Sequence, residues 1–373
     1  MKINANIAVL FSLLAGAANA ASLRSADVVP ETKQQQPDLH GSDLYTEFSK
    51  WTSAFNKEYT NEAHRMERFK IWAENHFIIH EHNAKESTYK MGHNAFSDLT
   101  SDEFAQRFGL GKHGVNAQMA KKKQAQKELM FRPELMEKTQ AEARRLQSLK
   151  LPDYVNWMHM GGVTDVKDQG ACGSCWAFST TGALEGAKFI RTGELVALSE
   201  QNLLDCDHLD LGCNGGLMDN AFKFDEKSGG LCSEEDYPYE AVQHNTCRTD
   251  CTDVPGSIVR TFYDVPEGDE KAMLAAIAMQ PISIAIQADQ NAFQFYKTGV
   301  LTDDTCGESG DIDHGVLAVG YGTDLETQEP YFLVKNSWGS SWGENGYIRL
   351  GRKSSNEFGI CAILKMASYP EVE

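Results

Sequence analysis

The chain has 373 residues, with 53 acidic and 35 basic side chains and a formal net charge of −18. The charge is uneven, because residues 1–150 contain 21 Lys+Arg and 18 Asp+Glu (+3), whereas residues 151–373 contain 14 and 35 (−21). A body this acidic argues against nucleic acid or an anionic membrane surface as a partner. The length exceeds that of one ordinary domain, so we expect a mildly basic leader before an acidic body.

The first 20 residues have the features of a secretory signal peptide. Lys2 precedes an apolar run over residues 7–15, and Ala18-Asn19-Ala20 follows as a cleavage site. The run is shorter than the roughly 18 apolar residues that a membrane span needs. The signal directs the chain to the secretory pathway, where an oxidising compartment favours disulfides. All nine cysteines lie at or beyond position 172, and an odd number leaves one thiol free.

Residues 43–109 are predicted to form a separate helical unit. Its apolar side chains recur at helical spacing, at Phe48, Trp51, Phe55, Phe69, Trp72 and Ile79. The unit resembles the inhibitory propeptide of the cathepsin L branch of cysteine proteases, through Arg68-x3-Trp72-x2-Asn75-x3-Ile79-x3-Asn83 and Gly92-x-Asn94-x-Phe96-x-Asp98. Two residues depart from that pattern, since His64 replaces the usual Glu and Trp72 replaces the commoner Phe. The long helix is therefore expected, whereas the salt bridge of the missing Glu is not.

Four histidines lie on this expected helix. His76 and His80 are four residues apart, a spacing that suits a metal ion as well as a solvated or packed pair. The sequence offers no third ligand, so a pair without metal is favoured. As an alternative role, His64, His76, His80 and His82 form a pH trigger, because histidine gains its charge near pH 6.5.

Residues 110–150 are rich in Lys, Gln, Ala and Glu, with basic runs at 121–123 and 144–145. This composition predicts a solvated linker. The following sequence, Leu151-Pro152-Asp153-Tyr154-Val155-Asn156-Trp157, resembles a mature N-terminus of the same protease family. We therefore expect a propeptide at 21–150, with its inhibitory part at about 43–109, and the enzyme at 151–373.

Cys172 and Cys175 form a CxxC pair, a pattern that redox dithiols and zinc sites also use. No second CxxC and no Cys/His knuckle follows, which disfavours zinc. Cys175 begins an apolar run that predicts a buried helix ended by Gly193. The first turn of a helix favours a thiolate and offers free N–H groups to an anion. Gln169 supplies a further side-chain donor.

Beyond Gly256 the pattern changes from helices to strands. Strands are predicted at 282–286, 315–321, 331–335 and 346–350. His314 lies 139 positions after Cys175, at the start of one of them. Asn336 can hold the second ring nitrogen of His314, and Trp338 can cover that bond from water. A helical lobe beside a β lobe predicts a cleft between them.

The string Cys-Gly-Ser-Cys-Trp at 172–176, with His314 and Asn336 in their motifs, resembles the papain family of cysteine proteases, in its cathepsin L branch. The resemblance extends from about residue 45 to the C-terminus. It implies an α+β fold in which a papain-like enzyme, with a helical lobe and a β-barrel-like lobe, follows a helical propeptide domain. It also implies a monomeric endopeptidase that needs no cofactor and no metal. Its expected partners are protein and peptide substrates, its own propeptide and cystatin-type inhibitors.

The resemblance further assigns substrate-binding positions and disulfides. The predicted substrate-binding residues are Gly173, Gly215, Gly216, Leu217, Met218, Ala285, Ile312, Asp313, Trp338 and Met366. They imply a preference for an apolar P2 residue. The family's three disulfides correspond to Cys172–Cys213, Cys206–Cys247 and Cys306–Cys361. With Cys175 free as the nucleophile, Cys232 and Cys251 are left as a fourth pair.

The expected catalytic set is Cys175, His314, Asn336 and Gln169. A cysteine of pKa about 8.5 that is ionised near pH 5 must shift by about 3.5 units, or roughly 5 kcal/mol. A helix N-terminus contributes at most about 2 kcal/mol. An imidazolium on His314 must therefore supply most of the shift. We expect a zymogen that is latent at neutral pH and processes itself at about pH 4–5, with a final cut near Lys150-Leu151.

Three other functions are weighed against this one. A non-catalytic homologue should lack Cys175, His314 or Asn336, and all three are present. An exopeptidase of the cathepsin B type needs an insertion with paired histidines, which the sequence does not contain. A peptide ligase would use the same thioester and would transfer it to added amines. The sequence has no Asn-x-Ser/Thr sequon for N-glycan sorting, and it leaves lysosome, vacuole and extracellular space as alternatives.

Overall fold

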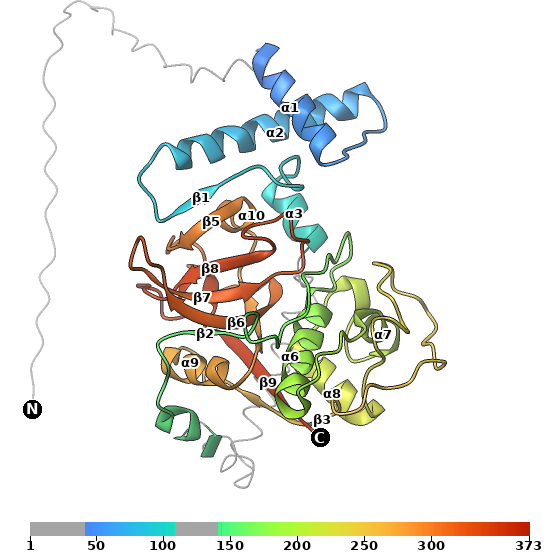
Figure 1. Ribbon diagram of the computed structural model, residues 1–373. Coiled ribbons are helices and arrows are strands. Elements are labelled where there is room, and N and C mark those ends of the chain that lie inside the picture. The colour runs from blue at the N-terminus through green and yellow to red at the C-terminus, as the bar shows by residue number, and fades with distance from the viewer. Residues whose placement is uncertain (1–41, 109–140, 143) are drawn as a thin grey trace, which may run out of the picture. The chain divides into compact units, whose positions relative to one another are not determined.

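The computed structural model describes residues 42–108, 141–142 and 144–373. Contacts join Leu39–Glu373 into one unit. The predicted signal peptide at 1–20 and most of the predicted linker lie outside the described residues. Figure 1 shows the helical elements of the propeptide, the helices around α6 and the strands of the β lobe. No helix in the described part of the chain is both long and apolar enough to cross a membrane.

Within residues 42–108, the predicted propeptide forms three helices and one strand, namely α1 (Ser42–Ala54), α2 (Glu62–Asn83), β1 (Tyr89–Met91) and α3 (Ser101–Phe108). α2 begins after Asn61, whose side chain accepts a hydrogen bond from the His64 N–H (2.9 Å) and caps the helix. α1 and α2 pack through buried aromatic rings, which include Phe48, Trp51, Phe69 and Trp72. The helical prediction for residues 43–109 is confirmed, with a short strand in addition.

Arg68 of α2 forms a salt bridge that the propeptide pattern does not predict. Its guanidinium donates to both carboxylate oxygens of Glu103 on α3, at 2.8 and 2.9 Å. Glu103 also accepts from the backbone N–H of Thr100, just before α3 (2.9 Å). The pair fastens α3 to the long helix.

The helical lobe of the enzyme contains α6 (Cys175–Thr192), α7 (Glu200–Cys206), η1 (Gly212–Asn214) and α8 (Met218–Ser228). α6 ends at the predicted residue, because Gly193 takes a left-handed conformation (φ 77°). Two glycines let α6 lie close to the β lobe. A Cβ at Gly182 would lie 2.7 Å from Leu317, and one at Gly186 would lie 2.6 Å from Pro281.

The β lobe is built from β2 (Val155–Asn156), β3 (Val259–Asp264), β4 (Ile282–Ile286), β5 (Tyr296–Leu301), β6 (His314–Thr323), β7 (Pro330–Lys335), β8 (Tyr347–Gly351) and β9 (Met366–Val372). The short helices α9 (Glu270–Met279), α10 (Asn291–Gln294) and η2 (Ile360–Ala362) complete it. The strands follow the order β1-β5-β8-β7-β6-β4-β9-β3, with β2 on β6. The four predicted strands correspond to β4, β6, β7 and β8, so the α+β prediction is confirmed.

Strand β1 of the propeptide extends the sheet of the enzyme. It pairs antiparallel with β5, with Tyr89 opposite Gly299 and Met91 opposite Tyr296. The hydroxyl of Thr88 donates to the Val300 carbonyl at the same edge (2.7 Å). The propeptide is thereby held to the β lobe by backbone pairing as well as by side chains.

Residues 141–142 and 144–148 are helical where the sequence predicts a solvated linker. Leu146 is buried in the core of the β lobe (0 % exposed). Tyr369 of β9 donates to the Glu142 carboxylate (2.6 Å), and Lys271 of α9 donates to the Gln147 carbonyl (2.7 Å). The linker prediction is wrong for these residues, because an apolar side chain and two polar contacts dock them on α9 and β9.

Four disulfides stabilise the enzyme part of the chain. They join Cys172–Cys213, Cys206–Cys247, Cys232–Cys251 and Cys306–Cys361, which are the four predicted pairs. Cys175 is the free cysteine, and it is buried. The oxidising compartment inferred from the sequence agrees with this pattern.

Candidate active site

Cys175 is the first residue of α6 and is fully buried (0 % exposed). Its backbone contacts the start of β6, since a Cβ at Gly315 would lie 3.2 Å from the Cys175 carbonyl oxygen. The lack of a side chain at Gly315 brings His314, the preceding residue, beside the candidate nucleophile. A helix N-terminus from one lobe and a strand start from the other therefore meet at this point.

The imidazole of His314 is held in one orientation. Its Nε2 donates to Oδ1 of Asn336 (2.8 Å), and the same oxygen accepts from the Ser337 N–H (2.8 Å). The second bond fixes the amide of Asn336, so a neutral imidazole carries its proton on Nε2. Trp338 stacks on the ring, with centroids 4.5 Å apart. Nδ1 is buried and has no hydrogen-bond partner among the described residues, which leaves it free to exchange a proton.

The carboxamide of Gln169 is oriented by Ser337. The Ser337 hydroxyl donates to Gln169 Oε1 (2.7 Å), and the backbone N–H of Gln169 donates to the Ser337 carbonyl (2.8 Å). With its oxygen engaged, the amide presents Nε2, which donates to the carbonyls of Cys172 (2.9 Å) and Phe108 (3.4 Å). Sequence reasoning missed Ser337, although its place between Asn336 and Trp338 was the available signal.

Helix α3 of the propeptide covers this group of residues. The rings of Phe104 and Phe108 lie against Trp338, with centroids 4.9 and 6.3 Å away. Phe108 is the last residue of α3, and its carbonyl oxygen is the one that faces the Gln169 amide. No motif pointed to Phe108, because it lies beyond the residues of the propeptide pattern.

Burial keeps Cys175 and His314 uncharged in this covered state. It raises the pKa of the Cys175 thiol to about 12, against backbone N–H groups that favour the thiolate. It also lowers the pKa of His314 to about 4, although the Asn336 side chain and the Phe108 carbonyl favour the charged ring. Burial therefore disfavours the thiolate–imidazolium pair expected from the sequence while the site is covered. Both charges would lack the water that solvates them.

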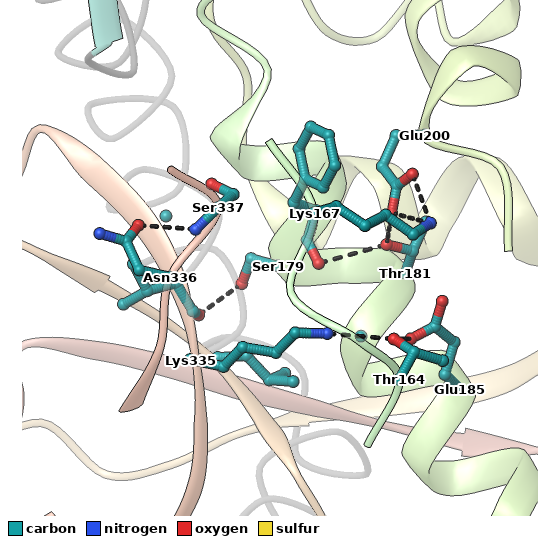
Figure 2. Close-up of a pocket in the computed structure, with 14 residues that line it drawn as sticks. Thr164, Lys167, Ser179, Thr181, Glu185, Glu200, Lys335, Asn336 and Ser337 are labelled. Carbon is teal, nitrogen blue, oxygen red and sulfur yellow. Dashed lines mark hydrogen bonds and ion pairs between the residues drawn. The ribbon is translucent and has the colours of Figure 1, made fainter. Parts of the chain in front are cut away.

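Behind these residues the two lobes meet in a buried network of charged side chains, which Figure 2 shows. Lys335 of β7 donates to the Thr164 hydroxyl (3.0 Å), which in turn donates to Glu185 of α6 (2.7 Å). Lys167 donates to both carboxylate oxygens of Glu200 on α7, at 2.9 and 2.7 Å. Burial lowers the pKa of Lys335, and Glu185 opposes this shift. The network fastens β7, which leads into the asparagine of the site, to the helical lobe.

The residues predicted for the S2 pocket lie in one hydrophobic cluster. Leu217, Met218, Ala285 and Met366 are buried in it, and Ile312 packs against it. Ala285 of β4 is paired with Met366 of β9 on one side and with Gly315 of β6 on the other. The structure therefore brings these predicted residues together beside the start of β6.

The glycines predicted to contact the substrate backbone lie next to the same region. A Cβ at Gly216 would lie 2.6 Å from the Trp176 ring, so the position cannot accept a side chain without movement. Gly215 has a φ of 107°, which L residues rarely adopt. Gly173 donates its N–H to the Cys213 carbonyl (3.0 Å). All three glycines are buried in the covered site.

The histidine pair on α2 has a protein partner. His76 Nδ1 lies 3.1 Å from Nε2 of His93, a residue that the sequence analysis did not single out. His80 stacks on His76, with centroids 6.3 Å apart. The described residues include no group of three or more His, Cys, Asp or Glu side chains placed to hold a metal ion.

Family models match both parts of the chain. Residues 151–371 match the papain family cysteine protease, and residues 48–104 match the cathepsin propeptide inhibitor domain. The chain therefore belongs to the papain family of cysteine proteases. The second match means that it also carries an inhibitory propeptide of the cathepsin type, which makes it a zymogen.

Individual relatives point to the cathepsin L branch. Cathepsin L1 of Drosophila melanogaster is 40 % identical over 378 residues, covering 100 % of this chain and 93 % of that protein. Cysteine protease XCP2 of Arabidopsis thaliana is 43 % identical over 335 residues, covering 89 % and 88 %. The solved structure of digestive procathepsin L 3 from the Tenebrio molitor larval midgut has a TM-score of 0.71 and 36 % identity, covering 88 % of this chain and 99 % of that one. The papain-like fold with a helical propeptide is confirmed.

Proposed function

We propose that this protein is the zymogen of a cysteine endopeptidase with Cys175 as nucleophile and His314 as acid and base. Asn336 orients the ring, and Gln169 donates to the oxyanion. The observation that carries the proposal is that the start of β6 lies against the N-terminus of α6. His314, held by Asn336 at 2.8 Å, directly precedes Gly315, which lies against the Cys175 backbone at the N-terminus of α6.

Peptide hydrolysis then proceeds through a thioester. The Cys175 thiolate attacks the substrate carbonyl carbon, and Gln169 Nε2 and the Cys175 N–H donate to the oxyanion. Protonated His314 gives a proton to the amine as the C–N bond breaks. His314 next takes a proton from water, whose oxygen attacks the thioester. The carboxylic acid leaves, and the thiolate and the imidazolium are restored.

The charged pair forms once the site is open to water. In the covered site burial raises the pKa of Cys175 and lowers that of His314, so both groups are neutral. Departure of α3 hydrates the site and removes the main cause of both shifts. The helix N-terminus and the neighbouring imidazolium then favour the thiolate, and the two groups titrate together.

Latency is supported by the position of the last residue of α3. The carbonyl of Phe108 lies 3.4 Å from the Gln169 amide nitrogen, the donor assigned to the substrate oxyanion. Phe104 and Phe108 pack on Trp338 beside the His314 ring. A substrate carbonyl cannot reach the Gln169 amide while the Phe108 carbonyl is there.

Activation at acidic pH is supported by the charges of the two parts. Without the signal peptide, residues 21–150 carry 20 basic and 18 acidic side chains (+2), against −21 for residues 151–373. Protonation of carboxylates near their usual pKa values, roughly 3.9–4.3, weakens this attraction. The propeptide therefore loosens at about pH 4–5.

The remaining features of the enzyme follow from the same assignment. The apolar cluster around Leu217 and Met366 selects an apolar P2 residue. The partners of the enzyme are protein and peptide substrates, its own propeptide and cystatin-type inhibitors. The enzyme acts as a monomer without cofactor or metal. The predicted signal peptide leads it through the secretory pathway to the lysosome, the vacuole or the extracellular space.

The test is incubation of the purified full chain and its Cys175→Ala form between pH 7 and pH 4, with sequencing of new N-termini and a library of peptide substrates. The unmodified chain should process itself at about pH 4–5, cut near Lys150-Leu151, and then cleave internal peptide bonds that have an apolar residue at P2. Equal processing at pH 7, or cleavage of the alanine form without added protease, would contradict the proposal.

A further inference from the structure

Ser174 stands at the N-cap of α6 but does not cap the helix. A serine at this position usually accepts a hydrogen bond from an N–H of the first turn. Here the Ser174 side chain makes no such bond, and its hydroxyl lies 2.6 Å from the Tyr239 hydroxyl instead. The serine side chain is therefore engaged elsewhere, while its backbone carbonyl accepts from the Ala177 N–H in the first turn (2.8 Å).

Tyr239 links this serine to Gln169. Its hydroxyl donates to the backbone carbonyl of Gln169 (2.7 Å). A phenol has one proton, so the short contact with Ser174 must be a bond that the serine donates. The resulting chain, Ser174 to Tyr239 to Gln169, spans the loop between the side-chain oxyanion donor and the helix that begins at Cys175.

Tyr239 is itself held firmly enough to set this spacing. Its ring packs edge-on against Phe178 of α6, with centroids 4.8 Å apart. Its backbone N–H donates to Oε1 of Glu234 (2.9 Å), and Oε2 of Glu234 binds Lys167 (3.1 Å), two residues before Gln169. Tyr239 is thus held by its ring contact to α6 and, through Glu234, by the segment that leads from Lys167 to Gln169.

Gly170 and Ala241, which follow Gln169 and Tyr239 in the chain, also lie close together. A Cβ at Gly170 would lie 3.3 Å from the Cβ of Ala241, and Gly170 has a φ of +57°. The segment that contains Tyr239 therefore lies along the loop that follows Gln169. Ser337 fixes the side-chain oxygen of Gln169 from the opposite direction, at 2.7 Å. Gln169 is therefore held at two points. The Ser337 hydroxyl binds its side-chain oxygen, and the Tyr239 hydroxyl binds its backbone carbonyl.

We propose that Tyr239 is a positioning residue for the hydrolysis reaction, and this inference rests on the proposed function. It touches neither the thiol nor the imidazole. Its hydroxyl sets where the Gln169 amide stands relative to the first N–H of α6, the two donors that receive the oxyanion. Loss of a whole oxyanion donor lowers kcat by about 10²–10³. Loss of its alignment should lower kcat by less, roughly tenfold to a hundredfold.

The experiment compares Tyr239→Phe with Tyr237→Phe, each made as the full chain, processed at acidic pH and titrated for active sites with an epoxide. Tyr237 is a matched control because it is two residues away and buried, and its hydroxyl donates to Asp205 (2.7 Å), outside the site. Tyr239→Phe should lower kcat with KM little changed. Tyr237→Phe should lower thermal stability and leave kcat unchanged.

A second readout separates alignment of donors from a general loss of structure. Alkylation of Cys175 by iodoacetamide forms no oxyanion, so its rate in Tyr239→Phe should match that of the unmodified enzyme. If Tyr239 acts through Gln169, the double variant Gln169→Ala with Tyr239→Phe should be no slower than Gln169→Ala alone. If Tyr239→Phe does not fold, Ser174→Ala breaks the other link and should lower kcat in the same way.

The inference is overturned by an equal fall of kcat in both tyrosine variants, by a parallel loss of alkylation in Tyr239→Phe, or by additive effects of Gln169→Ala and Tyr239→Phe. Hydrolysis by the Cys175→Ala chain would reject the proposed function and this inference together. A normal Cys175-dependent enzyme with unaltered Tyr239→Phe kinetics would reject this inference alone.

Discussion

The imidazole ring of His93 lies parallel to the indole of Trp72, with centroids 4.3 Å apart and planes 9° apart. At its edge, Nε2 of His93 meets Nδ1 of His76 at 3.1 Å. Two neutral imidazoles can share one hydrogen bond in this geometry, whereas two charged rings would both be donors. Trp72, a departure from the usual propeptide pattern, therefore supports a contact that is lost when both histidines are charged.

Burial lowers the pKa of His93 to about 4 and also lowers that of His76. The pKa of an unfolded histidine is about 6.5, so between about pH 6.5 and 4 the unfolded propeptide binds more protons than the folded one. The folded propeptide therefore loses stability as the pH falls through this range. His80 and Glu47, whose carboxylate lies 3.9 Å from His76 Nδ1, also face the pair.

The first prediction concerns this pair. His93→Phe keeps a ring on Trp72 and removes the titration, so the pH midpoint of self-processing should fall by about half a unit or more. Measurement requires gels of the processed chain across pH. His208→Gln is the control, because His208 is an exposed histidine outside the propeptide. A similar midpoint in all three proteins would remove His93 from the trigger.

The second prediction concerns latency. Phe104 is buried on Trp338 (2 % exposed), and loss of a buried Phe side chain typically costs about 3–5 kcal/mol. The uncut Phe104→Ala chain should therefore hydrolyse a small fluorogenic peptide at pH 7, where the unmodified zymogen is inactive. Phe77→Ala, on α2 and 40 % exposed, should stay latent. Equal activity of the two variants would contradict the covering role of α3.

The third prediction concerns the thiol. Because burial raises the pKa of Cys175 to about 12, alkylation of the zymogen at pH 7 should be slow. Removal of the propeptide should raise the rate at least about tenfold, since one pKa unit changes the thiolate fraction about tenfold. Mass spectrometry of the labelled peptide gives both rate and site. Labelling of a cysteine other than Cys175 in the folded enzyme would count against the nucleophile assignment.

The fourth prediction concerns the S2 pocket. Met366→Glu places a carboxylate in an apolar cluster, where it is stabilised only by a paired cation. Activity toward P2 Arg should rise and activity toward P2 Leu or Phe should fall, each by about tenfold. The ratio of kcat/KM for matched peptides measures the change. An unaltered P2 profile would place Met366 outside the pocket.

The elements that the sequence predicts are those with local signals. α6 could be placed because its apolar run ends at Gly193, and β4 because Ile282, Ile284 and Ile286 alternate along it. Cys175, His314 and Asn336 stand in short motifs, and the structure places them at one junction of α6, β6 and β7. The four disulfides were predicted from the resemblance and from the odd cysteine count.

What the sequence did not predict depends on contacts between distant residues. Arg68 and Glu103 are 35 residues apart, and β1 pairs with a strand more than 200 positions later. Neither contact has a local periodicity. Leu146 lies in a charged stretch, and only docking on α9 shows that it is buried. Tyr239 carries no motif either, because its role depends on a carbonyl 70 residues earlier.

Removal of the propeptide also changes the edge of the sheet. β5 pairs with β8 through Val300 and Leu301, while its other side is occupied by β1. Without β1, β5 becomes an edge strand. Gly299 keeps two bonds within the enzyme, because its N–H donates to Glu344 (3.0 Å) and its carbonyl accepts from the Tyr296 hydroxyl (2.6 Å). These bonds and the exposed charge of Lys297 protect the new edge, so maturation removes β1 without leaving a bare strand that readily pairs with another chain.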